Sequence, residues 1–203
     1  MQDDHPSIHP TASVSGMAVI GFRTRVWHGT QICDGATVGE DCIIGSGVYI
    51  DRGVVIGNRV KVQTGAQLYR GAVVEDGVFI GPLVCLANDK HPRAITSDGR
   101  LQTDVDWLQG EVHLRYGASL GAGTIVLPGV TVGRYAMTSA GSVVVQSIPD
   151  YGMVLGVPAR LVGYVCVCGH RLALREGSRP SSYECPSCHA HYREVEGAGL
   201  RPE

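Results

Sequence analysis

Aliphatic residues recur at every sixth position over the first part of this chain, from Ile8 to Leu86. The aliphatic positions are Ile8, Val14, Ile20, Val26, Ile32, Val38, Ile44, Ile50, Ile56, Val62, Leu68, Val74, Ile80 and Leu86. From Ala12 onward, the residue two positions before each of them is small or β-branched. So long a register indicates a repeated structural unit, in which neighbouring units bury one another's apolar side chains.

A period of six fits short strands separated by corners and does not fit an α-helix. Six residues advance a helix by about 600°, so successive aliphatic side chains would spiral around it. A straight strand would need every second residue to be apolar, whereas many of those positions hold Gly or a polar residue. Three strands and three corners close one coil, and coils stack about 4.8 Å apart. The pattern therefore predicts a parallel β-solenoid with the aliphatic ladder inside.

The register breaks after Leu86 and resumes at Leu114. The later positions are Leu114, Leu120, Val126, Val132, Thr138 and Val144. The interval is not a multiple of six, so residues 87–110 must leave the solenoid as a loop. This loop contains the polar run Asn88–Arg93. Because long loops on a regular scaffold usually carry function, we expect functional residues here.

Composition limits the partners expected of this chain. Lys and Arg number 17 against 19 Asp and Glu, which gives a net charge of −2. A nucleic-acid-binding protein would show a basic excess, so we expect no nucleic-acid partner. No apolar run approaches the roughly 18–20 residues that span a membrane, and residues 1–6 lack the features of a signal peptide. We therefore expect a cytoplasmic protein without a membrane partner.

Four cysteines crowd the C-terminal tail, as Cys166, Cys168, Cys185 and Cys188. In a reducing compartment such a group favours metal binding over disulfides. Four thiolates can surround Zn²⁺ tetrahedrally at about 2.3 Å and leave no open coordination position, so the metal would be structural. The tail is too short to build a core alone, and a metal would order it.

The ligand set of this site has alternatives. The earlier pair, Cys166 and Cys168, is one residue tighter than an ordinary zinc knuckle. His170 can replace one of these two cysteines for that reason, and His189 and His191 are further candidates. Free thiols without a metal remain the alternative to a zinc site.

The hexad register, the protruding loop and the closing segment Gly156–Arg160 together resemble the hexapeptide-repeat acyltransferases, over roughly residues 8–163. Within that superfamily the loop, with its segment Asn88–Ala94, resembles the nucleotide 3-amino-sugar N-acetyltransferases. The segments Pro128–Gly133 and Gly163–Cys166 continue the similarity.

The resemblance implies a left-handed parallel β-helix, a homotrimer, acetyl-CoA as acetyl donor and a nucleotide-linked amino sugar as acceptor. Handedness does not follow from the period, since the general rule for parallel crossovers favours a right-handed coil. We expect an acyltransferase domain at 1–163, with its loop at 87–110. A cysteine-rich, zinc-ribbon-like tail is expected at 164–203.

The implied reaction is attack of a neutral amine on a thioester carbonyl, which depends on positioning, on oxyanion stabilisation and on a destination for a proton. Asn88 can orient an amine or polarise a carbonyl, and the resemblance places it in an active site between subunits; an Asx-type turn is the alternative. Asp89 either accepts the proton or fixes the loop. His91 has a suitable intrinsic pKa, but the family carries Tyr or a similar residue there, so no base is assigned.

Basic residues are candidates for binding the phosphates of the nucleotide and of CoA. Lys90 and Arg93 belong to the loop, and Arg160 stands where the family commonly places a basic residue near CoA. His28 and His91 are candidates for contact with the sugar substrate. Small residues can let a pantetheine arm lie along the solenoid wall, although plain packing explains them equally well. These are Gly121, Ala122, Ala140 and Gly141.

Three other functions would each require a different set of residues. A three-histidine zinc site of the γ-class carbonic anhydrase type is disfavoured, because His28, His91 and His113 do not have its spacing. An O-acetyltransferase acting on a sugar or small hydroxyl would need a stronger base. A non-catalytic assembly module would have no need of the polar loop.

Overall fold

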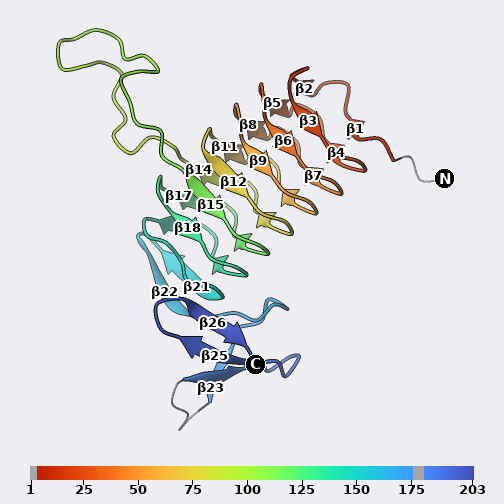
Figure 1. Ribbon diagram of the computed structural model, residues 1–203, viewed down its shortest axis with the longest axis vertical. Helices are drawn as coiled ribbons and strands as arrows, with labels where there is room; N and C mark the ends of the chain where they lie inside the picture. Colours follow the sequence, from red (N-terminus) through yellow and green to blue (C-terminus); the bar gives the residue numbers. More distant parts are fainter. Residues whose placement is uncertain (1–3, 176–180) are drawn as a thin grey trace.

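The computed structural model describes residues 4–175 and 181–203, so residues 1–3 and 176–180 of the two expected domains lie outside the described part. It is an elongated stack of coils that runs from the N-terminus toward a small C-terminal sheet, with one long loop projecting from its middle (Figure 1). Since strands and turns make up the described secondary structure, those residues include no helix that could cross a membrane.

Three sheets form the faces of the solenoid, and their strands are parallel except for β22, which is antiparallel to β21. Sheet A contains β1 (Ser7–Ile8), β4 (Arg25–Val26), β7 (Ile43–Ile44), β10 (Lys61–Val62), β13 (Phe79–Ile80), β16 (Ser119–Leu120), β19 (Met137–Thr138), β21 (Gly152–Gly156) and β22 (Ala159–Tyr164). Sheet B contains β2 (Ser13–Val14), β5 (Gln31–Ile32), β8 (Tyr49–Ile50), β11 (Gln67–Leu68), β14 (Cys85–Leu86), β17 (Ile125–Val126) and β20 (Val143–Val144). Sheet C contains β3 (Val19–Ile20), β6 (Thr37–Val38), β9 (Val55–Ile56), β12 (Ala72–Val74), β15 (Val112–Leu114) and β18 (Thr131–Val132).

The strand register gives the length of one coil. Ile8 pairs with Val26, and Val26 pairs with Ile44, so one coil spans 18 residues. The chain visits the sheets in the order A, B, C, which defines an A–B corner, a B–C corner and a C–A corner in each coil. The six-residue period thus produced the parallel β-solenoid that the sequence predicts.

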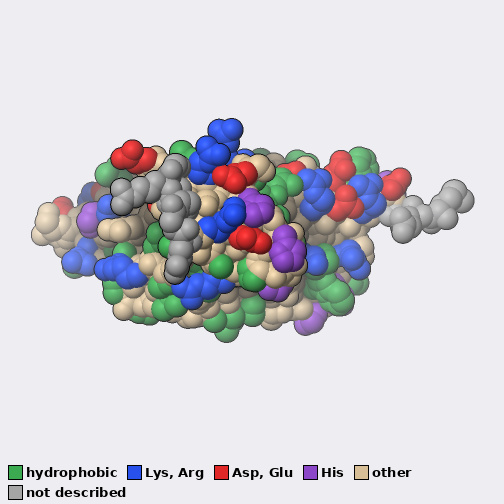
Figure 2. Space-filling view, turned by 90° about the horizontal axis from the view of Figure 1, so that it is seen from below, with side chains coloured by type: hydrophobic (Ala, Val, Ile, Leu, Met, Phe, Trp, Pro, Cys, Tyr) green, Lys and Arg blue, Asp and Glu red, His purple; other side chains and the backbone are tan. Residues whose placement is uncertain are grey.

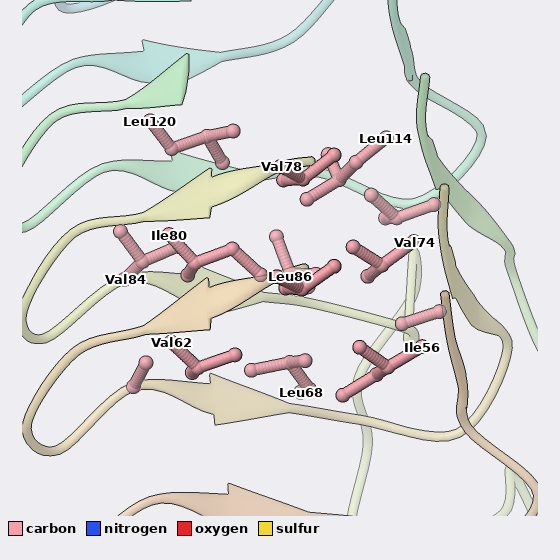
Figure 3. Packing of buried hydrophobic residues seen from close by; sticks show 14 of the residues in the cluster. Ile56, Val62, Leu68, Val74, Val78, Ile80, Val84, Leu86, Leu114 and Leu120 are labelled. Carbon is pink, nitrogen blue, oxygen red and sulfur yellow. The ribbon is translucent and has the colours of Figure 1, made fainter. Parts of the chain in front are cut away.

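The aliphatic ladder fills the interior of this prism. Ladder residues from successive coils, such as Ile56, Val62 and Leu68, point toward one another from the three faces (Figure 3). The first coil departs from this pattern, because no described residues cover its outer end: Ile8 is 41% exposed, and Val14 is only half-buried.

Coils approach closely at the glycines that follow ladder positions. A Cβ atom on Gly39 would lie 2.6 Å from the carbonyl oxygen of Gly57 in the next coil. A Cβ on Gly81 would lie 2.6 Å from the carbonyl oxygen of Leu120. Real Cβ atoms do not approach that closely, so these corners require glycine for the coils to stack.

Residues 87–111 separate β14 from β15, and the chain leaves and re-enters the solenoid at the same B–C corner. The amide of Gly110 donates to the carbonyl of Asn88 at 2.8 Å, and Asp89 and Gln109 form an antiparallel bridge. Above this neck the coil continues in register, with Leu114 paired to Val74. The excursion therefore leaves the ladder intact.

The C-terminal part forms an antiparallel sheet of β23 (Ala173–Arg175), β24 (Ser182–Glu184), β25 (His191–Val195) and β26 (Gly199–Pro202). A second apolar cluster lies beneath it, made of Tyr151, Cys166, Leu172, Cys185, Tyr192 and Leu200. Seen from below, the end where this sheet lies in Figure 1, acidic, basic and histidine side chains are interspersed over the surface (Figure 2). The cluster includes Tyr151 of the last coil, so the tail shares its core with the solenoid.

Truncating one ladder residue should destabilise the whole stack. Leu68 is fully buried in the middle of the solenoid, and Leu68→Ala should lower the free energy of unfolding by about 2–5 kcal/mol through the cavity it leaves. Its neighbour Gln67 points outward, so Gln67→Ala should change stability by less than about 0.5 kcal/mol. Urea denaturation of both variants measures the difference; equal midpoints would contradict the interior position of the ladder.

Candidate functional site

A cavity of about 550 Å³ lies between the two limbs of the loop and the solenoid corner at Pro128–Gly129. Its wall is formed by Asp89, Lys90, His91, Arg93, Gln102, Asp106, Trp107, Leu108, Gln109, Gly110, Pro128 and Gly129. Four of the residues selected from the sequence, Asp89, Lys90, His91 and Arg93, therefore face one space. It combines two cations with carboxylates and an indole ring.

Asn88 lies at the neck of the loop, directly before this cavity, and is half-buried. Its side-chain amide nitrogen donates to the carbonyl of Arg70 at 3.2 Å. Its Oδ1 atom makes no hydrogen bond to any residue that the structure describes. The amide is thus held by its donor end, and its acceptor end remains available to a ligand N–H.

The Asx turn that the sequence allowed at Asn88 is found at Asp89 instead. The Oδ1 atom of Asp89 accepts the backbone N–H of His91 at 2.9 Å. This contact fixes the start of the loop, which is one of the two roles considered for Asp89. The His91 ring is exposed, and neither Lys90 nor His91 forms an ion pair within the described ranges.

Arg70 joins the two limbs of the loop, and the sequence interpretation missed it. Its carbonyl accepts from Asn88, its backbone N–H donates to Asp51 Oδ2 at 3.1 Å, and its guanidinium lies 5.3 Å from the centre of the Trp107 ring. Such a cation–π contact favours a fixed ring position. The signal was present, because Arg70 lies one 18-residue coil before Asn88 in the register.

The neck is closely packed and the outer part of the loop is braced by charge. A Cβ atom on Gly71 would lie 2.6 Å from the carbonyl oxygen of Gly110. Farther out, Arg100 donates to Asp106 Oδ2 at 2.8 Å, and Thr103 donates to the same carboxylate. Hydrogen bonding from the Arg100 guanidinium holds the pKa of the Asp106 carboxyl well below its usual range. These contacts give the loop a defined conformation.

A histidine–carboxylate pair lies where the loop returns to sheet C. His113 Nε2 is 3.0 Å from Glu111 Oε2, and both side chains are partly exposed. The sequence interpretation considered His113 only as a zinc ligand. Since its side chain extends from β15, the strand that follows the loop, it is a further polar group near the neck.

The remaining candidates lie on other parts of the surface. His28 lies at the A–B corner of an early coil, where its ring packs 5.7 Å from that of His9 and its Nδ1 is 3.2 Å from Ser46 Oγ. Arg160 is exposed on β22, with a hydrogen bond from its guanidinium to the Ala159 carbonyl. Neither joins the loop within one chain.

The four small residues also follow the A–B corner, in the later coils. Gly121 has a packing reason, since a Cβ there would lie 2.6 Å from the amide nitrogen of Ala140. Gly141 faces open space and has a positive φ of 69°. Ala122 and Ala140 are exposed, so this corner presents a smooth wall. It is separate from the B–C corner that carries the loop.

The tail cysteines converge. The sulfur atoms of Cys166, Cys168, Cys185 and Cys188 all lie within 4.8 Å of one another. Cys166 and Cys188 are 3.4 Å apart, and Cys168 and Cys185 are 3.5 Å apart. Four soft sulfur donors at this separation suit Zn²⁺.

Of the histidine alternatives, only His170 stands beside the sulfurs, with Nδ1 at 3.4 Å from Cys168 Sγ. His189 contacts Glu184, and His191 contacts Arg175. Because the four sulfur atoms converge, the tight spacing of Cys166 and Cys168 is compatible with four cysteine donors.

Comparison with known proteins matches two models of hexapeptide repeats. The bacterial transferase hexapeptide model, of six repeats, covers residues 17–52. The model of the hexapeptide repeat of succinyl-transferase covers residues 35–70. Both lie in the N-terminal part of the ladder.

Among curated relatives, the chain is 48% identical over 63 residues to dTDP-3-amino-3,6-dideoxy-alpha-D-galactopyranose 3-N-acetyltransferase of Aneurinibacillus thermoaerophilus, covering 31% of this chain and 33% of that protein. It is 36% identical over 90 residues to serine acetyltransferase of Escherichia coli, covering 43% of this chain and 31% of that protein. The chain thus matches about a third of the length of each relative. A solved structure of a putative acetyltransferase from Bacillus cereus shares the fold, with a TM-score of 0.54 and 23% identity over 80% of this chain and 85% of that one.

Removing the Arg70 side chain should loosen the loop. Loss of the cation–π contact, about 0.5–1 kcal/mol, should raise the rate of tryptic cleavage within the loop about two- to fivefold. Arg52 occupies the same corner one coil earlier and is exposed, so Arg52→Ala is the matched control for Arg70→Ala. Mass spectrometry of a limited digest locates the cuts; equal loop cleavage in both variants would show that Arg70 does not hold the loop.

Proposed function

We propose that the chain is a hexapeptide-repeat acyltransferase that transfers acetyl from acetyl-CoA to the amine of a nucleotide-linked 3-amino sugar. The observation that carries the proposal is Asn88, which directly precedes Asp89 of the cavity wall and whose Oδ1 makes no hydrogen bond to a described residue. The 48%-identical match to an enzyme named for a dTDP-linked 3-amino sugar supports this acceptor class.

In this proposal Asn88 positions the amine. Its Oδ1 accepts an amine N–H, which directs the nitrogen lone pair toward the thioester carbonyl. An amine with a pKa of roughly 7.7–8.0 is about 10–15% neutral at pH 7, so orientation matters more than a strong base. The C–N bond forms, the C–S bond breaks and the CoA sulfur leaves.

The amine also loses a proton, and three groups near the neck are able to take it. Asp89 keeps one carboxylate oxygen beyond its contact with His91, and the His91 ring is exposed. His113, oriented by Glu111, adds a base that is held by a carboxylate. Transfer to solvent remains the simplest route for an exposed site.

Binding of the two phosphate-bearing substrates is assigned to separate corners. Lys90, His91 and Arg93 contact the nucleotide sugar in the loop cavity. The pantetheine arm of acetyl-CoA follows the smooth wall of the A–B corner, and Arg160 binds a phosphate near the end of the solenoid. His28 contacts the sugar from its own coil.

We propose a homotrimer because one chain leaves these groups on different corners. A threefold arrangement brings the loop corner of one chain to the A–B corner of its neighbour and completes the site. Bare apolar side chains on the loop support this arrangement, since Val105 is 89% and Leu108 is 90% exposed. The expected compartment is the cytoplasm, where nucleotide sugars and acetyl-CoA meet.

The tail is proposed to bind one structural Zn²⁺ through Cys166, Cys168, Cys185 and Cys188. Convergence of the four sulfur atoms supports this assignment. Four thiolates complete the coordination shell, so the metal has no part in acetyl transfer.

A hydroxyl acceptor is the second candidate, favoured by the 36% identity to serine acetyltransferase over 90 residues. A hydroxyl is far less acidic than an ammonium group, so this reaction needs a base of its own. The UDP- and dTDP-linked amino sugars offer an amine in place of that hydroxyl.

Replacing Asn88 tests the proposed site. Asn88→Ala should lower turnover about 10²-fold or more by losing the orientation of the amine, while assembly and melting temperature stay unchanged. Gln31→Ala, at an exposed position of β5, three strands away from β14 in sheet B, is the control.

The substrate panel for this test contains UDP- and dTDP-linked amino sugars together with serine, and mass spectrometry detects the added acetyl group. Acetylation of serine alone would favour a hydroxyl acceptor over an amino sugar. Full turnover by Asn88→Ala would remove Asn88 from the mechanism, and absence of acetyl-CoA binding in calorimetry would point to a non-catalytic module.

Metal content tests the tail separately. The purified protein should carry about one zinc per chain, and Cys188→Ser, at an exposed cysteine, should reduce it because three thiolates bind more weakly than four. Cys33 directly follows β5, far from the tail along the chain, so Cys33→Ser should retain full zinc. Elemental analysis measures both variants; a metal-free wild type prepared without chelators would refute the site.

A further inference from the structure

A tyrosine connects the cysteine cluster to the solenoid. The hydroxyl of Tyr192 lies 3.1 Å from Cys166 Sγ, and the backbone N–H of Val167 donates to the same hydroxyl at 3.1 Å. Tyr192 is 1% exposed, and Cys166 is also buried. A buried hydroxyl needs a partner for its proton, and the sulfur of Cys166 is the acceptor that the structure places there.

The direction of this hydrogen bond follows from the ligand chemistry. A metal-bound cysteine carries no proton, so the thiolate can only accept. Because Val167 already donates to the oxygen, the Tyr192 hydroxyl is free to donate its own proton to the sulfur. Hydrogen bonds of this kind orient a ligand and tune its basicity, and their removal typically lowers metal affinity by about 10- to 100-fold.

The ring of Tyr192 continues a stack that begins in the solenoid. It packs edge-to-face on Tyr151 with ring centres 5.2 Å apart, and Tyr151 stacks on Tyr135 at 5.5 Å with an interplanar angle of 17°. Tyr116 completes the stack at 5.6 Å from Tyr135. The column therefore runs along the C–A corner of the last coils to the cysteine cluster.

The corner tyrosines hold an unusual backbone. Tyr135 has a φ of 53° and Tyr151 a φ of 62°, a region that bulky residues rarely occupy. The equivalent corner of earlier coils adopts the same conformation, with a φ of 58° at Arg23 and 55° at Arg59, so the coil geometry sets it and the ring stack packs on it. Backbone hydrogen bonds add to it, from Val165 to the carbonyl of Tyr151 at 2.8 Å and from Leu200 to that of Asp150 at 3.2 Å.

We propose that Tyr192 is a positioning residue of the metal site, whose hydroxyl holds the Cys166 thiolate and whose ring links metal occupancy to the last coil of the solenoid. This inference rests on the proposed zinc site. Loading of the metal fixes Cys166, Cys166 fixes Tyr192, and Tyr192 packs against Tyr151. Loss of the metal should then loosen the C–A corner as well as the tail.

The test compares Tyr192→Phe with Tyr183→Phe in the full-length holoprotein. Phe fills the same space without the hydroxyl, so packing in the column is retained. Tyr183 lies on the neighbouring strand β24, packs edge-to-face on Tyr164 and makes no hydrogen bond to a cysteine among the described residues, which makes it the matched control. Metal release to a chromogenic chelator is followed over time, and Co²⁺-substituted protein reports the sulfur ligands through its charge-transfer bands.

Tyr192→Phe should bind metal about 10- to 100-fold more weakly and release it correspondingly faster, with a shifted Co²⁺–thiolate band. Tyr183→Phe should match the wild type in both measurements. A band and release rate unchanged in Tyr192→Phe would overturn the proposal, whereas a wild type that binds neither Zn²⁺ nor Co²⁺ would refute the zinc site itself.

The link to the solenoid has its own readout. Chelation should increase amide hydrogen exchange in the segment 133–152 of the wild-type protein, while exchange around the N-terminal coils stays constant. Exchange changes confined to residues after 164 would show that the metal orders the tail alone and would overturn this part of the proposal.

Discussion

Each coil of the solenoid rests on the side chains of the coil before it, and this stacking determines where function can be placed. Ladder residues lie one coil apart, as Val62 pairs with Ile44 and Ile80 with Val62. An insertion within a coil would move every later ladder residue off the one beneath it. A chain segment can be added where it leaves one corner and returns there, as the loop does between Asn88 and Gly110.

The same constraint separates the residues assigned to the two substrates of the proposed reaction. The loop cavity opens at the B–C corner, whereas the smooth wall of Gly121 and Ala140 follows the A–B corner. Rigid coils cannot bend one corner toward the other, because the ladder between them is close-packed. A second chain can place its own loop against such a wall without bending the coils, which is why the proposed site lies between subunits.

The six-residue period made most of the fold predictable from the sequence. Features that do not follow this period could not be predicted in the same way. The ladder and the break after Leu86 are direct consequences of the register. The contact of Arg70 with Asn88 was predictable from the same register, since the two residues lie one coil apart. Arg70 belongs to no motif, however, and so did not attract attention. The exposure of Ile8 follows from its place in an end coil, which a periodic pattern does not mark. Tyr192 was beyond prediction, because the path of the tail has no period that would place it beside Cys166.

The two ends of the solenoid pose the same physical problem and have different solutions. A stack of repeats exposes its interior at each end unless a capping element covers it. At the first coil the ladder residue Ile8 is exposed, whereas at the last coil the antiparallel tail packs over Tyr151. The tail is too small to build a core by itself, so its apolar side chains pack against Tyr151 of the coil that it covers. Cap and coil therefore stabilise each other, and the proposed metal, by ordering the cap, would contribute to the order of the coil.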